Sequence, residues 1–319
     1  MPIKYQMLGG GGSGLTVAIN TGVGSSVTLS NEKYNKTLIA NNNGLAVFEN
    51  LKIGTYNVKV VADGGLTDQM AIQVTGNQTE RIVFKVKELQ LGSKIKFSSG
   101  KKFLLSGKDV KGHATNSATL WSEYIVENYE FRRDGTSGTE TDSRNGCAYI
   151  DSTVHKKLMP KYYNELNDAE KSVLLEYRAK TYDSENGGFD YTNSFFWLPS
   201  DSELDREGNY TKDKEGKNIH LKMYEHLYDF VNVTSDNDFT DDWMRLKTFE
   251  NEKVAKPYFT RSNEYYSDVK FWRAGLVQAN GYILVENLPG VAGIVPACDI
   301  SQDAYVALDD DGYYFIIGK

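Results

Sequence analysis

The sequence has no long basic segment, because lysine and arginine never stand more than two in a row. The formal net charge is −7, from 36 Lys and Arg against 43 Asp and Glu. Phosphate backbones and anionic lipid surfaces are bound by clustered cations. The shortage of such clusters argues against both nucleic acid and a membrane as partners.

Long apolar segments are also missing. No stretch approaches the roughly 18 apolar residues that a helix needs to cross a bilayer. The start, Met1-Pro2-Ile3-Lys4, lacks the apolar core of a signal peptide. The sequence therefore predicts a protein that is made in the cytoplasm and kept there until another agent releases it.

Cysteine is limited to Cys147 and Cys298. Their spacing gives no sign of a disulfide, and a reducing cytoplasm would keep them as thiols. Whether the two residues pair stays open from the sequence.

The residues that are plentiful indicate a folded, β-rich chain. Apolar residues make up 40% and charged residues 25% of the 319, which is the composition of a globular protein. There are 21 Tyr and 14 Phe. Tyrosine combines a large apolar ring with a polar tip, so it suits both a β core and a surface that grips a partner.

Residues 15–88 predict a β-sandwich of seven short strands. Alternating runs are separated by turn-forming Gly and Asn, and Tyr56-Asn57-Val58-Lys59-Val60 alternates strictly. The strands are expected at 15–20, 26–30, 36–40, 45–48, 55–61, 69–75 and 80–86. Before them, residues 1–14 form an N-terminal tether whose glycine run, 9–14, packs either on its own domain or on a neighbouring subunit.

One segment of this region carries a specific pattern. Residues 44–58 read Gly-Leu-Ala-Val-Phe-Glu-Asn-Leu-Lys-Ile-Gly-Thr-Tyr-Asn-Val. The segment resembles the signature of carboxypeptidase-regulatory-like, transthyretin-like β-sandwiches, in which Ala46 and Phe48 point inward. The resemblance implies an immunoglobulin- or transthyretin-like attachment module without chemistry of its own.

Residues 89–319 predict a second domain of the α+β class. A hairpin is expected around Ser98-Ser99-Gly100, and a helix at 154–158. Asn167 and Glu170 form a capping box for a further helix, with Val173, Leu174 and Tyr177 on one face. Another helix is expected at 221–230, and strands at 196–198, 282–285, 294–296, 305–308 and 313–317.

A series of short motifs runs through this second region. In chain order they are Val154-His155-Lys156-Lys157-Leu158, Glu170-Lys171, Phe196-Trp197-Leu198-Pro199-Ser200-Asp201-Ser202-Glu203-Leu204, Tyr258-Phe259-Thr260-Arg261-Ser262 and Gly293-Ile294-Val295-Pro296-Ala297-Cys298. The series resembles an uncharacterised domain common in Firmicutes and their phages, which is similar to C-type-lectin-like folds. Residues 258–260 and 263 depart from that pattern, and residues 205–218 look like an inserted loop.

The motif residues are interpreted as scaffold. Phe196, Trp197, Phe259 and Ile294 are expected in the core. Arg261 is expected to pair with a buried carboxylate such as Glu203, an ion pair that is costly to break from one side.

No catalytic constellation is evident, so the chain is predicted not to be an enzyme and to need no cofactor. No two histidines stand at the four-residue spacing of a helical zinc motif, and no metal site is predicted. The acidic loop at 236–242 is a weak calcium candidate, whereas Asp309-Asp310-Asp311-Gly312 reads as a tight turn. No pair of carboxylates is singled out for glycoside hydrolysis.

The segment 263–280 is the predicted binding surface. In lectin-like relatives this stretch supplies the variable exposed face, and aromatic, amide and carboxylate side chains suit sugars or protein epitopes. The candidate ligand-binding residues are Tyr265, Tyr266, Asp268, Trp272, Arg273 and Gln278.

Together these features predict a non-catalytic structural protein of a bacteriophage virion: a fibre, a decoration protein or a host-binding adhesin. Its expected partners are other virion proteins, further copies of itself, and a glycan or protein of the host surface. Two alternatives stay open: a polysaccharide-degrading virion enzyme and a bacterial surface adhesion module.

Overall fold

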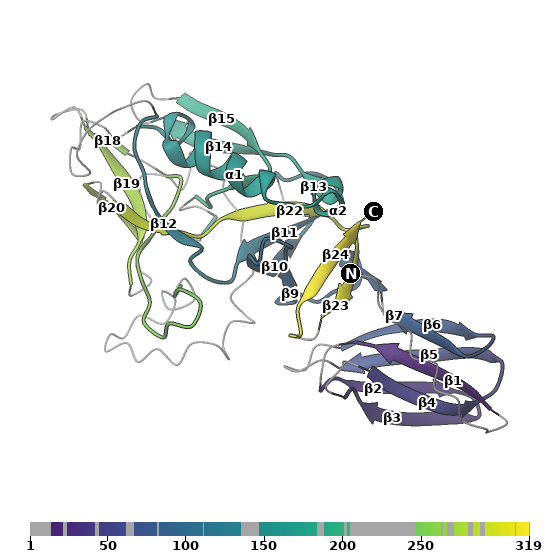
Figure 1. The fold of residues 1–319 in the computed structure, drawn as a ribbon. Helices are drawn as coiled ribbons and strands as arrows, with labels where there is room; N and C mark the ends of the chain where they lie inside the picture. Colours follow the sequence, from purple (N-terminus) through teal and green to yellow (C-terminus); the bar gives the residue numbers. More distant parts are fainter. Residues whose placement is uncertain are drawn as a thin grey trace. The chain divides into compact units, whose positions relative to one another are not determined.

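The computed structural model is built mainly of β-strands. It describes residues 14–21, 24–41, 45–61, 67–81, 83–110, 112–134, 147–183, 188–200, 203–204, 247–262, 264–266, 271–279, 283–287, 291–309 and 311–318. The chain divides into two compact units, a smaller one of residues 1–84 with 307–313 and a larger one of residues 85–306 with 314–319 (Figure 1).

The smaller unit contains two sheets. The first has the order β4-β1-β7 and the second the order β3-β2-β5-β6. Their strands are β1 (Leu15–Asn20), β2 (Ser26–Asn31), β3 (Tyr34–Ile39), β4 (Leu45–Leu51), β5 (Gly54–Val61), β6 (Thr67–Val74) and β7 (Gln78–Arg81). Six of the seven expected strands are therefore confirmed, with ends that differ by a few residues, whereas the strand expected at 80–86 is divided between β7 and β8 (Val83–Lys85).

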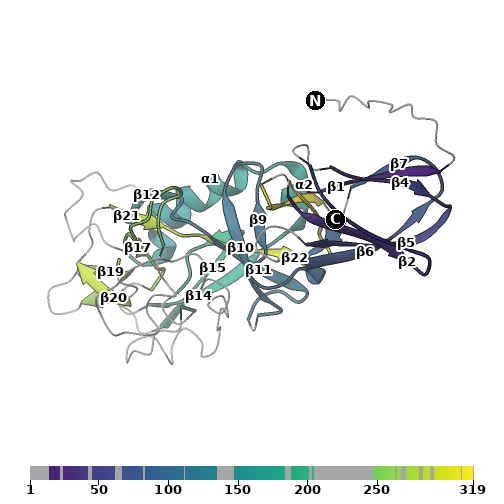
Figure 2. The same cartoon turned by 90° about the horizontal axis from the view of Figure 1, so that it is seen from below.

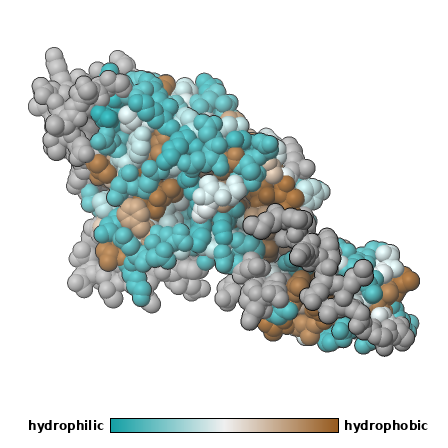
Figure 3. Space-filling model, in the orientation of Figure 1, coloured by the Kyte–Doolittle hydropathy of each residue, from teal (hydrophilic) through white to brown (hydrophobic). Residues whose placement is uncertain are grey.

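Strand alternation builds the core of this unit. In β5 the side chains of Tyr56, Val58 and Val60 are buried while those between them face solvent. Ala46 and Phe48 of β4 are buried as expected. Apolar residues also remain at the surface of this unit (Figure 3), where Ile39 and Ile53 are exposed.

Gly14, the last residue of the glycine run, lies against β4. A Cβ atom at this position would stand 2.3 Å from the Asn50 Cα, so only glycine permits this approach. Residue 14 thus packs on its own unit, and residues 1–13 of the expected tether lie outside the described part of the chain.

The strands from β8 onward form two sheets and a ribbon, and all of them except parts of β8 and β23 fall within the residue range of the larger unit. Among the described residues, a nine-stranded sheet has the order β13-β22-β11-β10-β9-β24-β23-β8, with β16 on β22, and a six-stranded sheet has the order β12-β21-β17-β19-β18, with β20 on β19. Strands β14 and β15 form a separate two-stranded ribbon. In both Figure 1 and Figure 2, strands β19 and β20 lie at the opposite end of this unit from β9.

The strands of these sheets are β8 (Val83–Lys85), β9 (Lys94–Lys96), β10 (Lys102–Lys108), β11 (Ser117–Ser122), β12 (Glu127–Glu130), β13 (Leu174–Leu175), β14 (Tyr177–Asp183), β15 (Gly188–Ser194), β16 (Phe196–Trp197), β17 (Tyr258–Phe259), β18 (Glu264–Tyr266), β19 (Phe271–Val277), β20 (Ile283–Asn287), β21 (Val291–Ile294), β22 (Ala297–Ser301), β23 (Tyr305–Leu308) and β24 (Tyr314–Gly318). The helical segments are η1 (Val86–Glu88), η3 (Tyr149–Asp151), η4 (Val154–Leu158), α1 (Met159–Asn164) and α2 (Asp168–Val173).

The hairpin expected around residues 98–100 is confirmed as β9–β10, with Gly100 at φ +84° in the turn. The capping box of α2 is confirmed too, because Asn167 accepts from the Glu170 N–H at 2.9 Å and Glu170 accepts from the Asn167 N–H at 3.0 Å. Glu170 is buried and also accepts from the Ser98 hydroxyl at 2.6 Å. This carboxylate therefore ties α2 to the β9–β10 turn.

The helix expected to continue to Tyr177 is shorter than predicted. It ends at Val173, because Leu174 and Leu175 pair with Ile300 and Asp299 of β22. From Leu174 onward the backbone therefore forms hydrogen bonds with β22 instead of continuing the helix. The helix expected at 221–230 lies outside the described residues.

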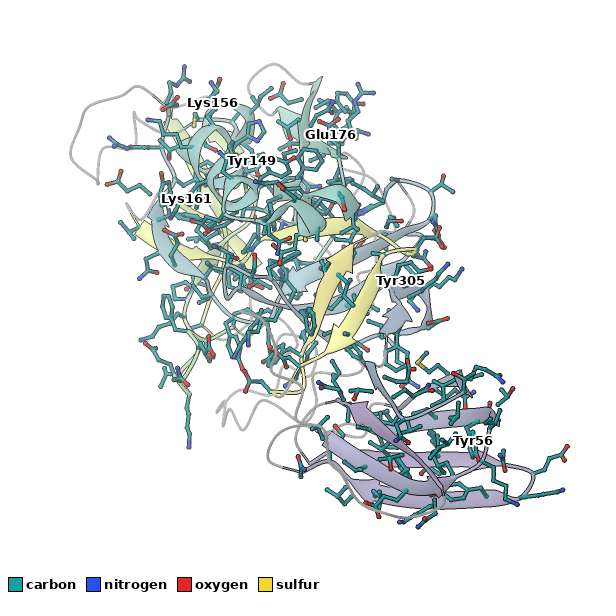
Figure 4. The ribbon with its side chains drawn as sticks, turned by 45° about the vertical axis from the view of Figure 1, so that its right-hand side comes forward. Tyr56, Tyr149, Lys156, Lys161, Glu176 and Tyr305 are labelled. Atoms are coloured by element: carbon teal, nitrogen blue, oxygen red, sulfur yellow. The ribbon has the colours of Figure 1, made fainter. Side chains whose placement is uncertain are left out.

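The core of the larger unit contains the predicted motif residues. Phe196, Trp197, Phe259 and Ile294 are each at most 1% exposed. Tyr149 is fully buried and lies among the crowded side chains of this unit in Figure 4, whereas the labelled Lys156 lies at its periphery. The expectation that these four side chains lie in the core is confirmed.

Candidate binding groove and buried polar cluster

The predicted binding surface lies on a β-hairpin at one end of the six-stranded sheet. Strands β18 and β19 are antiparallel, with Tyr265 opposite Trp272 and Tyr266 opposite Phe271. Arg273 stands opposite Glu264 in the same ladder. The register thus brings four aromatic positions together in two neighbouring pairs.

Most side chains of this predicted surface are not among those that the structure describes. Asp268 and the side chains of Tyr265, Tyr266, Trp272 and Arg273 lie outside the described residues. Gln278 follows β19 and is half-buried. Whether these six residues bind a ligand stays a prediction.

A groove in the larger unit was not predicted. It has a volume of about 470 Å³ and is formed by the β9–β10 turn at residues 99–102, the β11–β12 connection from Ser122 to Glu127, and the pair Phe249 and Glu250. This volume falls within the roughly 300–1,000 Å³ of small-ligand sites. Phe249 and Tyr124 supply rings, and four charged side chains supply donors and acceptors.

Long-range pairing assembles the groove. Ile125 donates its N–H to the Thr248 carbonyl at 2.9 Å and forms an isolated bridge with Phe249. The Lys102 ammonium donates to the Glu250 carboxylate at 2.6 Å. These contacts join three segments that are distant in sequence, and no local motif marks any of them.

The acidic side of the groove is Glu127. Its carboxylate accepts from the Tyr162 hydroxyl at 3.0 Å and lies 3.3 Å from the Lys161 ammonium. Lys161 is the residue labelled at the edge of the larger unit in Figure 4. Lys101 pairs with Glu165 and lies 4.6 Å from the centre of the Tyr162 ring. The charged groups of the groove are therefore held in place before any ligand arrives.

A buried lysine supports one wall of the groove. The Lys247 ammonium donates to the Ser122 carbonyl at 2.6 Å and lies 3.9 Å from the centre of the Trp121 ring. Burial lowers the pKa of Lys247 to about 7, and the nearby Glu123 carboxylate opposes that shift in part. Lys247 thus connects the 247–250 segment to β11 and the residues that follow it.

The predicted ion pair between Arg261 and Glu203 is confirmed. Two guanidinium nitrogens donate to the two carboxylate oxygens, each at 2.5 Å, and both side chains are at most 2% exposed. Burial alone raises the pKa of Glu203, but the charge and hydrogen bonds of Arg261 outweigh it, so the pKa lies below its ordinary value. The Tyr177 hydroxyl and the Ser200 N–H donate to the same carboxylate at 2.9 Å.

A histidine lies beside this pair. His113 Nδ1 is 2.7 Å from Asp299 Oδ2, and the Thr119 hydroxyl donates to the other Asp299 oxygen at 2.6 Å. The His113 ring stacks on Tyr177, with 4.3 Å between centres. Such a His–Asp pair orients the imidazole in serine hydrolases, which also place a nucleophilic hydroxyl on the second ring nitrogen. Within the described residues, His113 Nε2 has no hydrogen-bond partner, so no triad is formed there.

The cysteines and acidic loops carry no metal site in the part of the chain that the structure describes. There, no group of three or more His, Cys, Asp or Glu side chains is placed to hold a metal ion. Asp309 accepts from the N–H groups of Asp311 and Tyr313, which confirms the expected turn. The calcium candidate at 236–242 lies outside the described residues. Cys147 and Cys298 are both reduced and buried.

The helices that the structure describes do not include one that is long and apolar enough to cross a membrane.

The comparison with protein families gives one match. The family model described as a domain of unknown function, DUF6273, matches residues 115–302. That range is more than half of the chain and contains the β11–β12 wall of the groove, the Glu203–Arg261 pair and the predicted surface on β18–β19. No curated protein matches the chain.

Proposed function

The chain belongs to the DUF6273 family, and from that premise we propose that it is a non-catalytic structural protein of a bacteriophage virion: a fibre, a decoration protein or a host-surface adhesin. Its N-terminal part, an immunoglobulin- or transthyretin-like sandwich, attaches the chain to the particle. Its C-terminal part, a C-type-lectin-like α+β domain, displays binding surfaces to the host.

The observation that carries the binding role is the groove. Rings, ammonium groups and carboxylates line one cavity of about 470 Å³, and lysine–glutamate pairs fix the charged groups. Preorganised donors and acceptors beside aromatic rings suit a sugar or a polar peptide segment. Weak binding at each copy would gain strength from many copies on one symmetric particle.

The assignment to a virion rests on the sequence. The supporting feature is the pairing of a transthyretin-like motif with the Firmicutes and phage motif series. A bacterial surface adhesion module is the competing location.

Mass spectrometry of purified virions tests this location. We expect the chain in density-purified particles, at a copy number that is a multiple of the particle symmetry. Absence from virions together with recovery in the envelope of the encoding cell would overturn the virion assignment.

A polysaccharide-degrading enzyme is favoured by one observation: Glu127 and Glu250 line the same groove. Two carboxylates across a cleft are what glycoside hydrolysis requires. We expect no release of reducing ends from envelope polysaccharide by the full-length protein. Release that disappears in both Glu127→Gln and Glu250→Gln would establish the enzyme instead.

A further inference from the structure

The β14–β15 ribbon has two different faces. The side chains of Tyr177, Ala179, Thr181 and Thr192 are at most 3% exposed, and they form the buried face. Residues between them in sequence point the other way, because successive strand residues alternate. The outward face carries two aromatic rings, Phe189 at 38% and Tyr191 at 46% exposure.

A cation lies over each ring. The Arg178 guanidinium is 4.2 Å from the centre of the Tyr191 ring, and the Lys180 ammonium is 3.7 Å from the centre of the Phe189 ring. The register sets Lys180 directly opposite Tyr191. Each cation therefore lies over the ring that is diagonal to it on the neighbouring strand, and the two contacts have the same offset in register.

These contacts fix the positions of the two cations. Long basic side chains normally lose conformational freedom when they bind a ligand, and a cation already held over a ring loses less. Arg178 and Lys180 are two residues apart on one strand, which separates their Cα atoms by about 6.6 Å at ~3.3 Å per residue. The ribbon thus presents two ordered positive charges at a fixed spacing.

The charge of this face is opposite to that of the whole chain. The chain has a net charge of −7. The described side chains of the outward face within the strands are Arg178, Lys180, Phe189, Tyr191 and Asn193, which include two cations and no carboxylate. Glu176, labelled in Figure 4, precedes the first strand and bounds the face at that end.

We propose that the outward face of β14–β15 binds an anionic polysaccharide. Regularly repeated negative charges along a linear glycan meet the spaced cations, while the rings and the Asn193 amide contact the sugar units. The inference rests on the proposed display function and adds a ligand class and a surface separate from the groove.

Affinity electrophoresis of the full-length protein tests this proposal with matched ligands. Polygalacturonate supplies a carboxylate on each sugar, its methyl ester has the same backbone without the charge, and poly(glycerol phosphate) supplies phosphodiesters. We expect retardation by polygalacturonate, weakened by salt, none by the methyl ester, and weaker retardation by poly(glycerol phosphate), which offers charges but no sugar units.

Two variants with the same change in net charge locate the binding surface. Arg178→Gln with Lys180→Gln should weaken polyanion binding by at least about tenfold. Lys52→Gln with Lys59→Gln removes two exposed cations from the smaller unit and should leave binding unchanged. Far-UV circular dichroism and the unfolding temperature verify that both variants fold.

Three outcomes would overturn the inference: equal retardation by polygalacturonate and its methyl ester, no effect of the Arg178 and Lys180 replacements, or tighter binding of single-stranded DNA than of any glycan. A Tyr124→Ala change in the groove should leave polyanion binding intact. If the unmodified protein binds host envelopes but no polyanion, only this inference is contradicted, whereas absence of the chain from virions contradicts the proposed function.

Discussion

Replacing Arg261 with methionine should destabilise the larger unit strongly. The change leaves the Glu203 carboxylate buried without its cation, and it also removes a donor from the Leu198 carbonyl, which Arg261 contacts at 2.8 Å. Breaking a buried pair from one side costs about 3–5 kcal/mol. For a unit of this size, each kcal/mol lowers the melting temperature by about 2–4 °C, so a fall of about 6–20 °C is expected.

Differential scanning calorimetry of the full-length protein measures this effect. Lys256→Met is a matched control, because Lys256 and Glu252 are 3.9 Å apart and both about half exposed, and surface pairs of this kind contribute little. The double variant Glu203→Leu with Arg261→Met removes both charges and should recover part of the loss. A melting temperature of Arg261→Met within 2 °C of wild type would refute the reasoning.

Three further predictions concern other buried groups. The pKa of Lys247 is lowered to about 7 from 10.5, so between these pH values the unfolded state holds the proton that the folded side chain has lost. Lys247 therefore contributes a rise of about 1.4 kcal/mol per pH unit to the free energy of unfolding. In urea titrations the slope of the wild type should exceed that of Lys247→Met by this amount, and an identical slope in the variant would contradict the shift. Burial raises the pKa of Cys147 to about 12, and it raises the pKa of Cys298 as well. Neither thiol should therefore react with Ellman's reagent at pH 8 until denaturant is added. Rapid reaction of the native protein would argue against the burial of these thiols. Phe48→Ala should destabilise the smaller unit by about 3–5 kcal/mol, because the ring is fully buried, and two calorimetric transitions would show whether the loss stays within that unit.

The strands of the smaller unit could be predicted because their signal is local. Alternation in residues 56–60 fixes which side chains face inward, and turn residues separate one strand from the next. The strand expected at 80–86 is instead two strands, β7 and β8, followed by η1. There the backbone N–H groups of Val86 and Lys87 donate to the carbonyls of Ala304 and Gln302, which alternation alone does not reveal.

The candidate site could be predicted only in part, because many of its contacts join residues that are distant in sequence. The Glu203–Arg261 pair could be predicted because both residues belong to the motif series. Gly293 also belongs to that series, and a Cβ atom at this position would stand 2.8 Å from an Ile125 methyl group. The His113–Asp299 contact joins residues 186 positions apart, so no spacing rule marks it. The groove combines three distant segments, and only the completed sheets bring them together.

The central claim is that the larger unit displays a groove that binds the host surface. Its most direct test is binding of labelled full-length protein to cell envelopes of the host, compared with two tyrosine variants. Tyr124→Ala removes a ring from the groove, and Tyr305→Ala removes a ring that is 40% exposed on β23, outside the groove. We expect saturable binding that falls at least about tenfold in Tyr124→Ala and is unchanged in Tyr305→Ala. No envelope binding, or equal binding by both variants and the wild type, would contradict it.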